Sequence, residues 1–164
     1  MRIAALLSVL LMALPAGAQE TTFTPEDAKL MTECIEGLAA SNNAESDFAD
    51  VQPQTQCIGA ASNICMQTDY STLGMTECMG RETDWWDSQL NVHYASLEES
   101  LEPELFTSLQ QAQRAWIAFR DASCGFEYEL WSEGTIRSIV GASCMLELTA
   151  QRADALSGYV NRTP

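Results

Sequence analysis

The stretch from Gln113 to Cys124, Q-R-A-W-I-A-F-R-D-A-S-C, restricts the fold more than any other part of the chain. It places a tryptophan, an arginine–aspartate pair and a cysteine on about three turns of a predicted helix. A short glycine-containing break follows, and Cys144 lies on the next predicted helix. A disulfide between Cys124 and Cys144 would join two antiparallel helices, and such a bond persists in an oxidising compartment.

The first 18 residues have the pattern of a cleaved signal peptide. Arg2 precedes an apolar run and Pro15, and residues 16–18 are small, as signal peptidase requires. The run is too short to span a bilayer and no second one follows, so we expect a periplasmic or secreted protein with no membrane insertion. The rest is long enough for one hydrophobic core. We expect an N-terminal helical extension over residues 19–63 and a helical domain over residues 64–160.

All of the cysteines follow the predicted signal peptide: Cys34, Cys57, Cys65, Cys78, Cys124 and Cys144. An even number in a small exported chain is typical of a disulfide framework. A zinc site is the alternative, but the chain has one histidine, His93. Cys57 and Cys65 are also too far apart in sequence for a zinc knuckle. We therefore predict disulfides, no metal and no cofactor.

The same reasoning about turns favours a second pairing, Cys65–Cys78. Cys65 precedes a predicted turn, and Cys78 lies in the first turns of the helix that follows. This leaves Cys34 to pair with Cys57 by elimination. Closing the loop of about 20 residues between the last two cysteines would stabilise the fold by about 3 kcal/mol in the loop-entropy model.

Helical periodicity dominates the sequence, which predicts an all-α fold, a small antiparallel bundle stapled by disulfides. Capping and proline signals predict helices over residues 25–40, 72–101, 103–132 and 136–159, and a short helix that begins at Pro53. On the helix 103–132 we expect one buried stripe: Leu105, Leu109, Ala112, Trp116, Phe119, Ser123, Phe126 and Leu130. We expect Trp86 to be buried as well, and Trp85 and Trp131 to be more open.

The formal net charge of −15 restricts the partners. An acidic surface repels nucleic acid and anionic lipid, so we expect neither as a partner. It would attract a basic protein and raise the rate of association. The alternative is that the charge only keeps an exported protein soluble.

Several separated elements resemble the LprI-type lysozyme-inhibitor family of small exported bacterial helical domains. They are Cys65, M-T-E-C ending at Cys78, W-D-S-Q-L-N-V-H-Y, the tryptophan–arginine stretch described above, and the segment from Gly134 to Arg152. Together they cover residues 65–159. One departure is Phe119, where the family usually has tyrosine. The resemblance implies a binding protein that inhibits lysozyme rather than an enzyme.

Charged and amide side chains on the predicted helices allow two interpretations: Asp87, Asn91, Gln113, Arg120, Asp121 and Arg152. They could serve acid–base chemistry, but nothing places two carboxylates around a pocket. We therefore expect a structural polar network, because unpaired buried charges are costly. His93 has no nucleophile that the sequence pairs with it, so we predict no catalytic residues and no enzymatic activity.

The break between the last two helices is the candidate binding loop: Ser132, Glu133, Gly134 and Thr135. It is the tight, polar protrusion that could enter the carbohydrate cleft of a cationic lysozyme. The expected function is therefore an exported protein-binding domain that inhibits lysozyme stoichiometrically. The alternative is an envelope structural or stress-related interaction protein with a different partner.

Overall fold

The structure is a computed structural model that describes residues 23–44 and 53–162. Its elements are α1 (Pro25–Ala44), the 3-10 helix η1 (Gln54–Cys57), α2 (Ser62–Met66), α3 (Thr72–Ser100), α4 (Pro103–Leu130) and α5 (Ile136–Val160). The described residues contain no strand, and the predicted all-α fold is confirmed. The predicted signal peptide lies outside the described residues.

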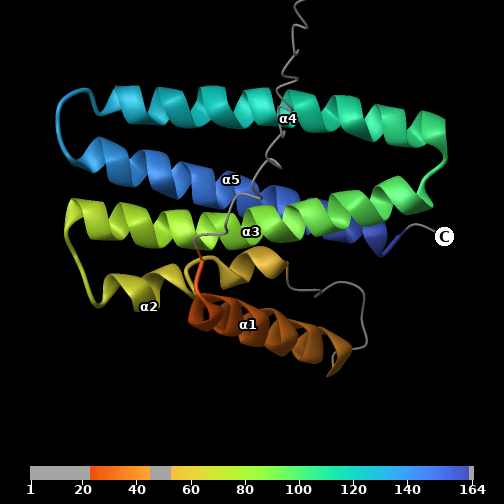
Figure 1. The fold of residues 1–164 in the computed structure, drawn as a ribbon, viewed down its shortest axis with the longest axis horizontal. Helices are drawn as coiled ribbons and strands as arrows, with labels where there is room; N and C mark the ends of the chain where they lie inside the picture. Colours follow the sequence, from red (N-terminus) through yellow and green to blue (C-terminus); the bar gives the residue numbers. More distant parts are fainter. Residues whose placement is uncertain (1–22, 45–52, 163–164) are drawn as a thin grey trace, which may run out of the picture.

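Three long antiparallel helices form the body of the molecule (Figure 1). Helix α3 packs extensively against α5, and α4 packs against the other side of α5. The short helices α1 and α2 contact α3 on the side away from α4, and η1 packs against α5 and α1 (Figure 1). Helix α3 therefore has neighbours on two sides, whereas α4 is the outermost long helix.

Local sequence signals explain where the helices begin. The backbone N–H of Asp27 donates to Thr24 Oγ1 at 3.1 Å, and the backbone N–H of Thr24 donates to Asp27 Oδ2 at 2.8 Å, which is a reciprocal cap of α1. Ser71 caps α3 by accepting the Gly74 N–H at 3.0 Å. Pro103 opens α4, where its missing N–H costs no hydrogen bond.

Two of the predicted helices differ from the observed ones. Helix α1 continues to Ala44, beyond the expected end at residue 40. The expected helix from Pro53 is instead two short segments, η1 and α2. The break lies at Gly59, whose φ of 93° is in the left-handed region that favours glycine.

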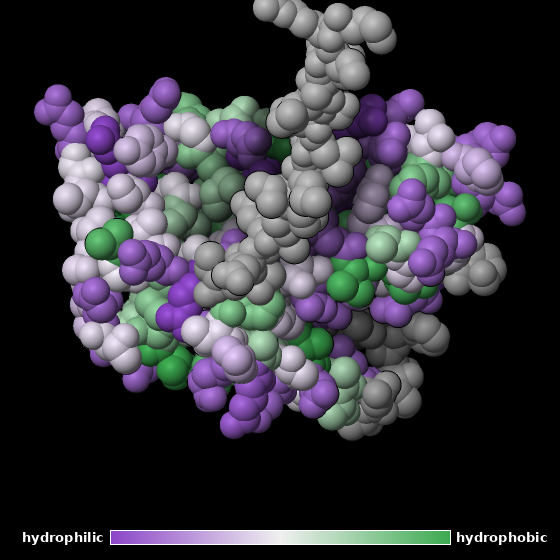
Figure 2. Space-filling view, viewed as in Figure 1, coloured by the Kyte–Doolittle hydropathy of each residue, from purple (hydrophilic) through white to green (hydrophobic). Residues whose placement is uncertain are grey.

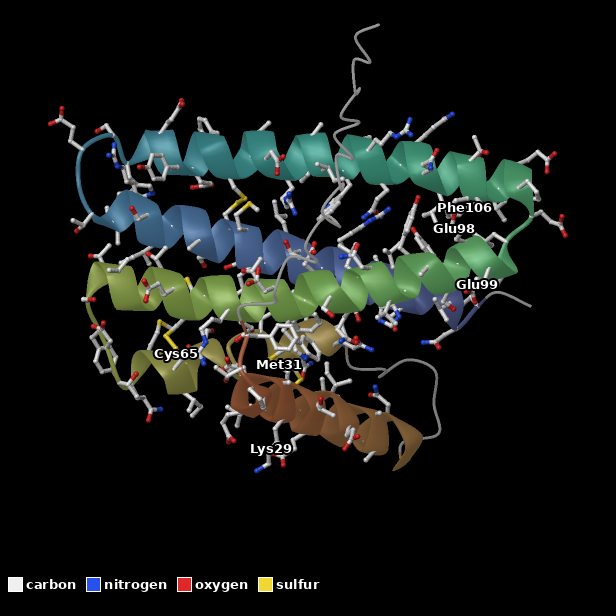
Figure 3. All side chains as sticks on the ribbon, viewed as in Figure 1. Lys29, Met31, Cys65, Glu98, Glu99 and Phe106 are labelled. Carbon is white, nitrogen blue, oxygen red and sulfur yellow. A yellow bond between two sulfur atoms is a disulfide. The ribbon has the colours of Figure 1, made fainter. Side chains whose placement is uncertain are left out.

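The core lies between α3 and α5, with α1 closing it from below. Trp86 of α3 and Leu156 of α5 are fully buried, and so is Met31 of α1. Figure 3 shows Met31 on the face of α1 that points toward α3. The expectation that Trp85 would be open is wrong, since only 6% of it is exposed. Because α3 is covered on two sides, adjacent residues can both be buried, and the two tryptophan rings pack edge to face at 4.9 Å.

The buried stripe expected on α4 is largely wrong. Leu109, Trp116 and Ser123 are half-buried, but five of its members are exposed: Leu105, Ala112, Phe119, Phe126 and Leu130. The residues of α4 that are buried are Gln113 and Cys124. The reason is that α4 packs chiefly on α5, so only a narrow face of α4 is covered. The predicted stripe lies to one side of this covered face.

Three disulfides join neighbouring elements, and they are the pairs that the sequence predicted: Cys34–Cys57, Cys65–Cys78 and Cys124–Cys144. The first joins α1 to η1, the second joins α2 to α3, and the third joins α4 to α5. Their Cα–Cα distances of 5.8, 5.6 and 5.5 Å are usual for this bond. In the described part of the chain, no helix has the length and apolar character that crossing a bilayer requires.

Candidate functional site

The loop between α4 and α5 lies at the end of the bundle opposite the turn between α3 and α4 (Figure 1). All four residues of the predicted binding loop, Ser132 to Thr135, are exposed. Ser132 has a φ of 33° and Gly134 a φ of 152°, so the reversal uses two left-handed positions. Arg137 braces it by donating from Nη1 to the Ser132 carbonyl at 2.9 Å. The loop thus has a defined backbone shape on an exposed end.

Exposed apolar side chains lie at the C-terminal end of α4, directly before this loop. The exposed fractions are 62% for Phe126, 60% for Leu130 and 49% for Trp131. Acidic residues lie among them in the sequence, at Glu129 and within the loop itself. Exposed aromatic and aliphatic groups beside charge are a common composition of protein-binding surfaces. We define this surface, residues 126–136, as the loop end.

The six residues of the expected polar network do not form one network. They form three separate pairs, Asn91 with Asp87, Arg120 with Asp121, and Arg152 with Gln113. The first two pairs are exposed, and each joins residues on a single helix. The third links α5 to α4, because Arg152 Nε donates to Gln113 Oε1 at 2.7 Å. Arg152 therefore bonds to an amide oxygen of a neighbouring helix and not to a carboxylate.

Trp116 connects two of these pairs through its ring. The guanidinium carbons of Arg120 and Arg152 lie 5.0 and 5.9 Å from the ring centroid, within the range of cation–π attraction. A groove of about 370 Å³ opens beside it between α3 and α4. Asp87, Asn91, Gln113 and Arg120 line this groove, whereas Asp121 and Arg152 do not. The structure thus places five of the six predicted residues beside one tryptophan, because four line the groove and Arg152 lies over the ring.

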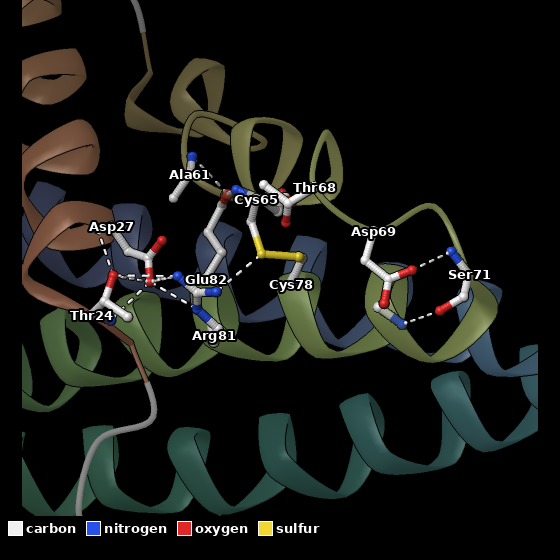
Figure 4. The surroundings of a disulfide bond; sticks show 12 residues. Thr24, Asp27, Ala61, Cys65, Thr68, Asp69, Ser71, Cys78, Arg81 and Glu82 are labelled. Atoms are coloured by element: carbon white, nitrogen blue, oxygen red, sulfur yellow. Dashed lines mark hydrogen bonds and ion pairs between the residues drawn. A yellow bond between two sulfur atoms is a disulfide. The ribbon is translucent and has the colours of Figure 1, made fainter.

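The sequence reasoning missed a buried carboxylate, Glu82 of α3, which is fully buried. Its two oxygens accept the backbone N–H groups of Gly59 at 2.7 Å, Ala61 at 3.2 Å and Ser62 at 2.7 Å. Figure 4 shows the side chain reaching from α3 toward Ala61, beside the disulfide that joins α2 and α3. An acidic residue four positions before Trp86 on the buried face was the signal that could have revealed it. Glu82 holds the start of α2 against α3.

A second polar cluster ties α1 to α3. Arg81 of α3 donates to Asp27 of α1 and to Thr24 Oγ1 (Figure 4). Burial alone would raise the pKa of Asp27, but the hydrogen bonds from Arg81 and Thr24 together lower it. Arg81 also contacts the sulfur of Cys65 from Nη1 at 3.1 Å. This cluster holds the start of α1 against α3, which is a structural role.

His93 and Arg152 both lie where burial disfavours their charged forms. Burial lowers the pKa of His93, and the carboxylate of Asp154 opposes this effect. Burial also lowers the pKa of Arg152, and Tyr159 opposes it. Among residues 23–44 and 53–162, no group of three or more histidine, cysteine, aspartate or glutamate side chains is placed to hold a metal ion.

Comparison with known proteins identifies the family. The family model described as "Lysozyme inhibitor LprI" matches residues 63–156. An uncharacterized protein of Rhizobium meliloti (strain 1021) is 30% identical over 120 residues, 64% of this chain and 78% of its own length. An uncharacterized 17.7 kDa protein in the puhA 5' region of Rhodobacter capsulatus is 23% identical over 134 residues, 71% of this chain and 83% of its own. No solved structure matches. The matched residues span more than half of the chain, which therefore belongs to the LprI lysozyme-inhibitor family.

Proposed function

We propose that this protein is a stoichiometric inhibitor of a basic lysozyme and that the loop end, residues 126–136, makes the contact. Membership of the LprI family supports the class of partner. The observation that carries the choice of surface is the exposed Trp131, followed directly by a loop with two left-handed residues. A loop of defined shape can enter a cleft at a lower entropic cost than a flexible one.

The charge of the molecule supports the same partner. A net charge of −15 creates a negative potential that attracts a cationic protein before contact is made. Glu133 within the loop would meet the basic surface of the lysozyme, and Trp131 would serve as the apolar anchor. Substrate would be excluded because the carbohydrate cleft is occupied. This mechanism needs no catalytic group in the inhibitor.

Export fits this role, since the six cysteines all form disulfides and such bonds persist in oxidising compartments. The predicted cleaved signal peptide would carry the chain to the periplasm or to the medium. The competing function is an envelope structural or stress-related interaction protein with a partner other than lysozyme. The same exposed surface would then serve that partner, and inhibition assays distinguish the two functions.

The test is lysis of bacterial cell walls, measured as loss of turbidity, with excess natively oxidised protein and several lysozymes. We expect inhibition that weakens as salt rises, because screening shortens electrostatic attraction to about 8 Å at physiological ionic strength. Reduced and alkylated protein is the control. Inhibition that is independent of salt would mean that the acidic surface only confers solubility. Absence of inhibition at low salt would favour the alternative function, an interaction protein whose partner is not lysozyme.

Point variants test the surface. Trp131→Ala should raise the inhibition constant by about tenfold or more, as the loss of an interface anchor usually does. Glu133→Gln should mainly slow association and reduce the salt dependence. The matched controls are Tyr70→Ala, an aromatic residue 70% exposed before α3, and Glu36→Gln, an exposed acid of α1. If the control variants lost as much inhibition as the loop-end variants, the loop end would not be the contact surface.

A further inference from the structure

A second groove lies far from the loop end, where α3, α4 and the C-terminal part of α5 meet. It has a volume of about 460 Å³. Four leucines and two arginines dominate its lining: Leu97, Leu101, Leu105, Leu109, Arg152 and Arg162. Apolar side chains remain on the surface near the turn between α3 and α4 (Figure 2). We call this the leucine groove.

The groove exists because α4 packs chiefly on α5 and contacts α3 less closely. The antiparallel helices α3 and α4 flank α5. The side chains of the three helices leave a space between α3 and α4, next to α5. Leu97 forms the floor with 1% of its surface exposed, while Leu105 stands at the rim with 57% exposed. Covering the exposed apolar part of this groove would remove it from water, which is favourable.

The two arginines give the groove a charge opposite to that of the whole chain. Arg152 donates from Nε to Gln113, but its Nη2 is buried and has no hydrogen-bond partner among the described residues. Arg162 donates from Nε to the Gly158 carbonyl at 2.8 Å. Neither arginine forms an ion pair with a described carboxylate. This is unusual in a chain with 23 acidic residues, and a buried donor without an acceptor is costly.

We propose that the leucine groove binds a single-chain anionic amphiphile, with the acyl chain along the leucines and the anionic head at Arg152 and Arg162. The planar guanidinium group matches the oxygens of a carboxylate or phosphate. The volume of about 460 Å³ is in the range of small-molecule sites. The head can come from a free fatty acid or from a lysophospholipid, which share this chemistry.

This site is separate from the proposed lysozyme contact. Leu109 in the groove and Leu130 at the loop end are 21 positions apart on one helix, which corresponds to roughly 30 Å at 1.5 Å per residue. The leucine groove and the loop end therefore share no residue. The groove can be tested whether or not the protein inhibits lysozyme.

The experiment is calorimetric titration of the oxidised protein with decanoate, decanol and decanoyl lysophosphatidylglycerol, each below its micellar concentration. We expect one saturable site for the anionic ligands and binding of decanol that is weaker by about tenfold or more, because decanol lacks the charged head. Tighter binding of decanoate than of the lysophospholipid would identify a fatty acid as the ligand of the groove. The reverse order would identify a ligand with a phosphate head. Absence of saturable anionic binding, or equal binding of decanol, would overturn the proposal.

Variants at the rim locate the site without disturbing the core. Leu105→Asp should abolish decanoate binding, whereas Val92→Asp, at an apolar residue of α3 that is 58% exposed, should leave it unchanged. Arg162→Gln should weaken binding severalfold, and Arg114→Gln, at an exposed arginine that does not line this groove, should not. Circular dichroism confirms that each variant is folded. Equal losses in the rim and control variants would place binding elsewhere and refute the assignment.

Discussion

Removal of the Glu82 carboxylate tests how the short helix α2 is held in place. The side chain is fully buried and accepts three backbone N–H groups, from Gly59, Ala61 and Ser62. Trp86 Nε1 lies within 3.4 Å of the same carboxylate. In Glu82→Ala these donors lose their acceptor inside the protein. In Glu82→Gln an amide oxygen replaces one carboxylate oxygen, and an NH2 donor faces the N–H groups left over.

The expected magnitudes follow from the number of stranded donors. A buried donor without an acceptor costs about 1–3 kcal/mol. Glu82→Gln leaves at least one such donor, so we expect a loss of about 2 kcal/mol in the free energy of unfolding. Glu82→Ala strands the three backbone donors and the Trp86 N–H, but removing the buried carboxylate also recovers its desolvation energy and lets water enter. We therefore expect a loss of about 4 kcal/mol for Glu82→Ala.

The measurement is urea unfolding with the disulfides intact, followed by circular dichroism. Glu99→Ala on the same helix is the matched control, since Glu99 is exposed and should change stability by less than about 0.5 kcal/mol (Figure 3). A loss below about 1 kcal/mol in Glu82→Ala, with an unchanged denaturant slope, would show that water or the disulfides hold the turn without the carboxylate.

Three further changes test other parts of the fold. Replacing Cys124 and Cys144 by alanine should lower the free energy of unfolding by about 3 kcal/mol from the restored loop entropy, measured by urea unfolding. No loss would show that packing alone joins α4 to α5. Phe119→Ser should change the melting temperature little, since Phe119 is 58% exposed. A large fall in the melting temperature would show that the Phe119 ring is packed in the core. Burial lowers the pKa of His93. The unfolded chain therefore takes up a proton below about pH 6.5 before the folded chain does, and stability falls as pH drops through this window. In His93→Gln the free energy of unfolding should depend less on pH between 7.5 and 5.5. An unchanged pH dependence would show that His93 does not cause it.

Local sequence signals predicted the long helices well. Helix α3 was expected over residues 72–101 and spans Thr72–Ser100, and α4 was expected over residues 103–132 and spans Pro103–Leu130. Proline at the first turn, capping hydroxyls and a glycine break act within a few residues of the boundary that they set. The disulfide pairs were also predictable, because cysteines on either side of a tight turn come within bonding distance.

Burial on α4 and the polar contacts could not be predicted in the same way. The apolar periodicity of α4 is real, but which side is covered depends mainly on the position of α5. Arg152 bonds to Gln113, 39 positions away, and not to a carboxylate. The burial of α4 and the partner of Arg152 both depend on distances between helices. The periodicity of one helix carries no information about those distances.

The sequence by itself determined that the chain is helical, that its cysteines pair across turns, that it is strongly acidic, and that it resembles the LprI family. Tertiary structure alone decided that Glu82 accepts the N–H groups of Gly59, Ala61 and Ser62, and that Arg152 lies beside an apolar groove with its Nη2 unpaired among the described residues. The physical reason is the range of the interactions. Helix formation depends on neighbours three or four positions apart, whereas burial and pairing depend on which distant segments come to lie side by side.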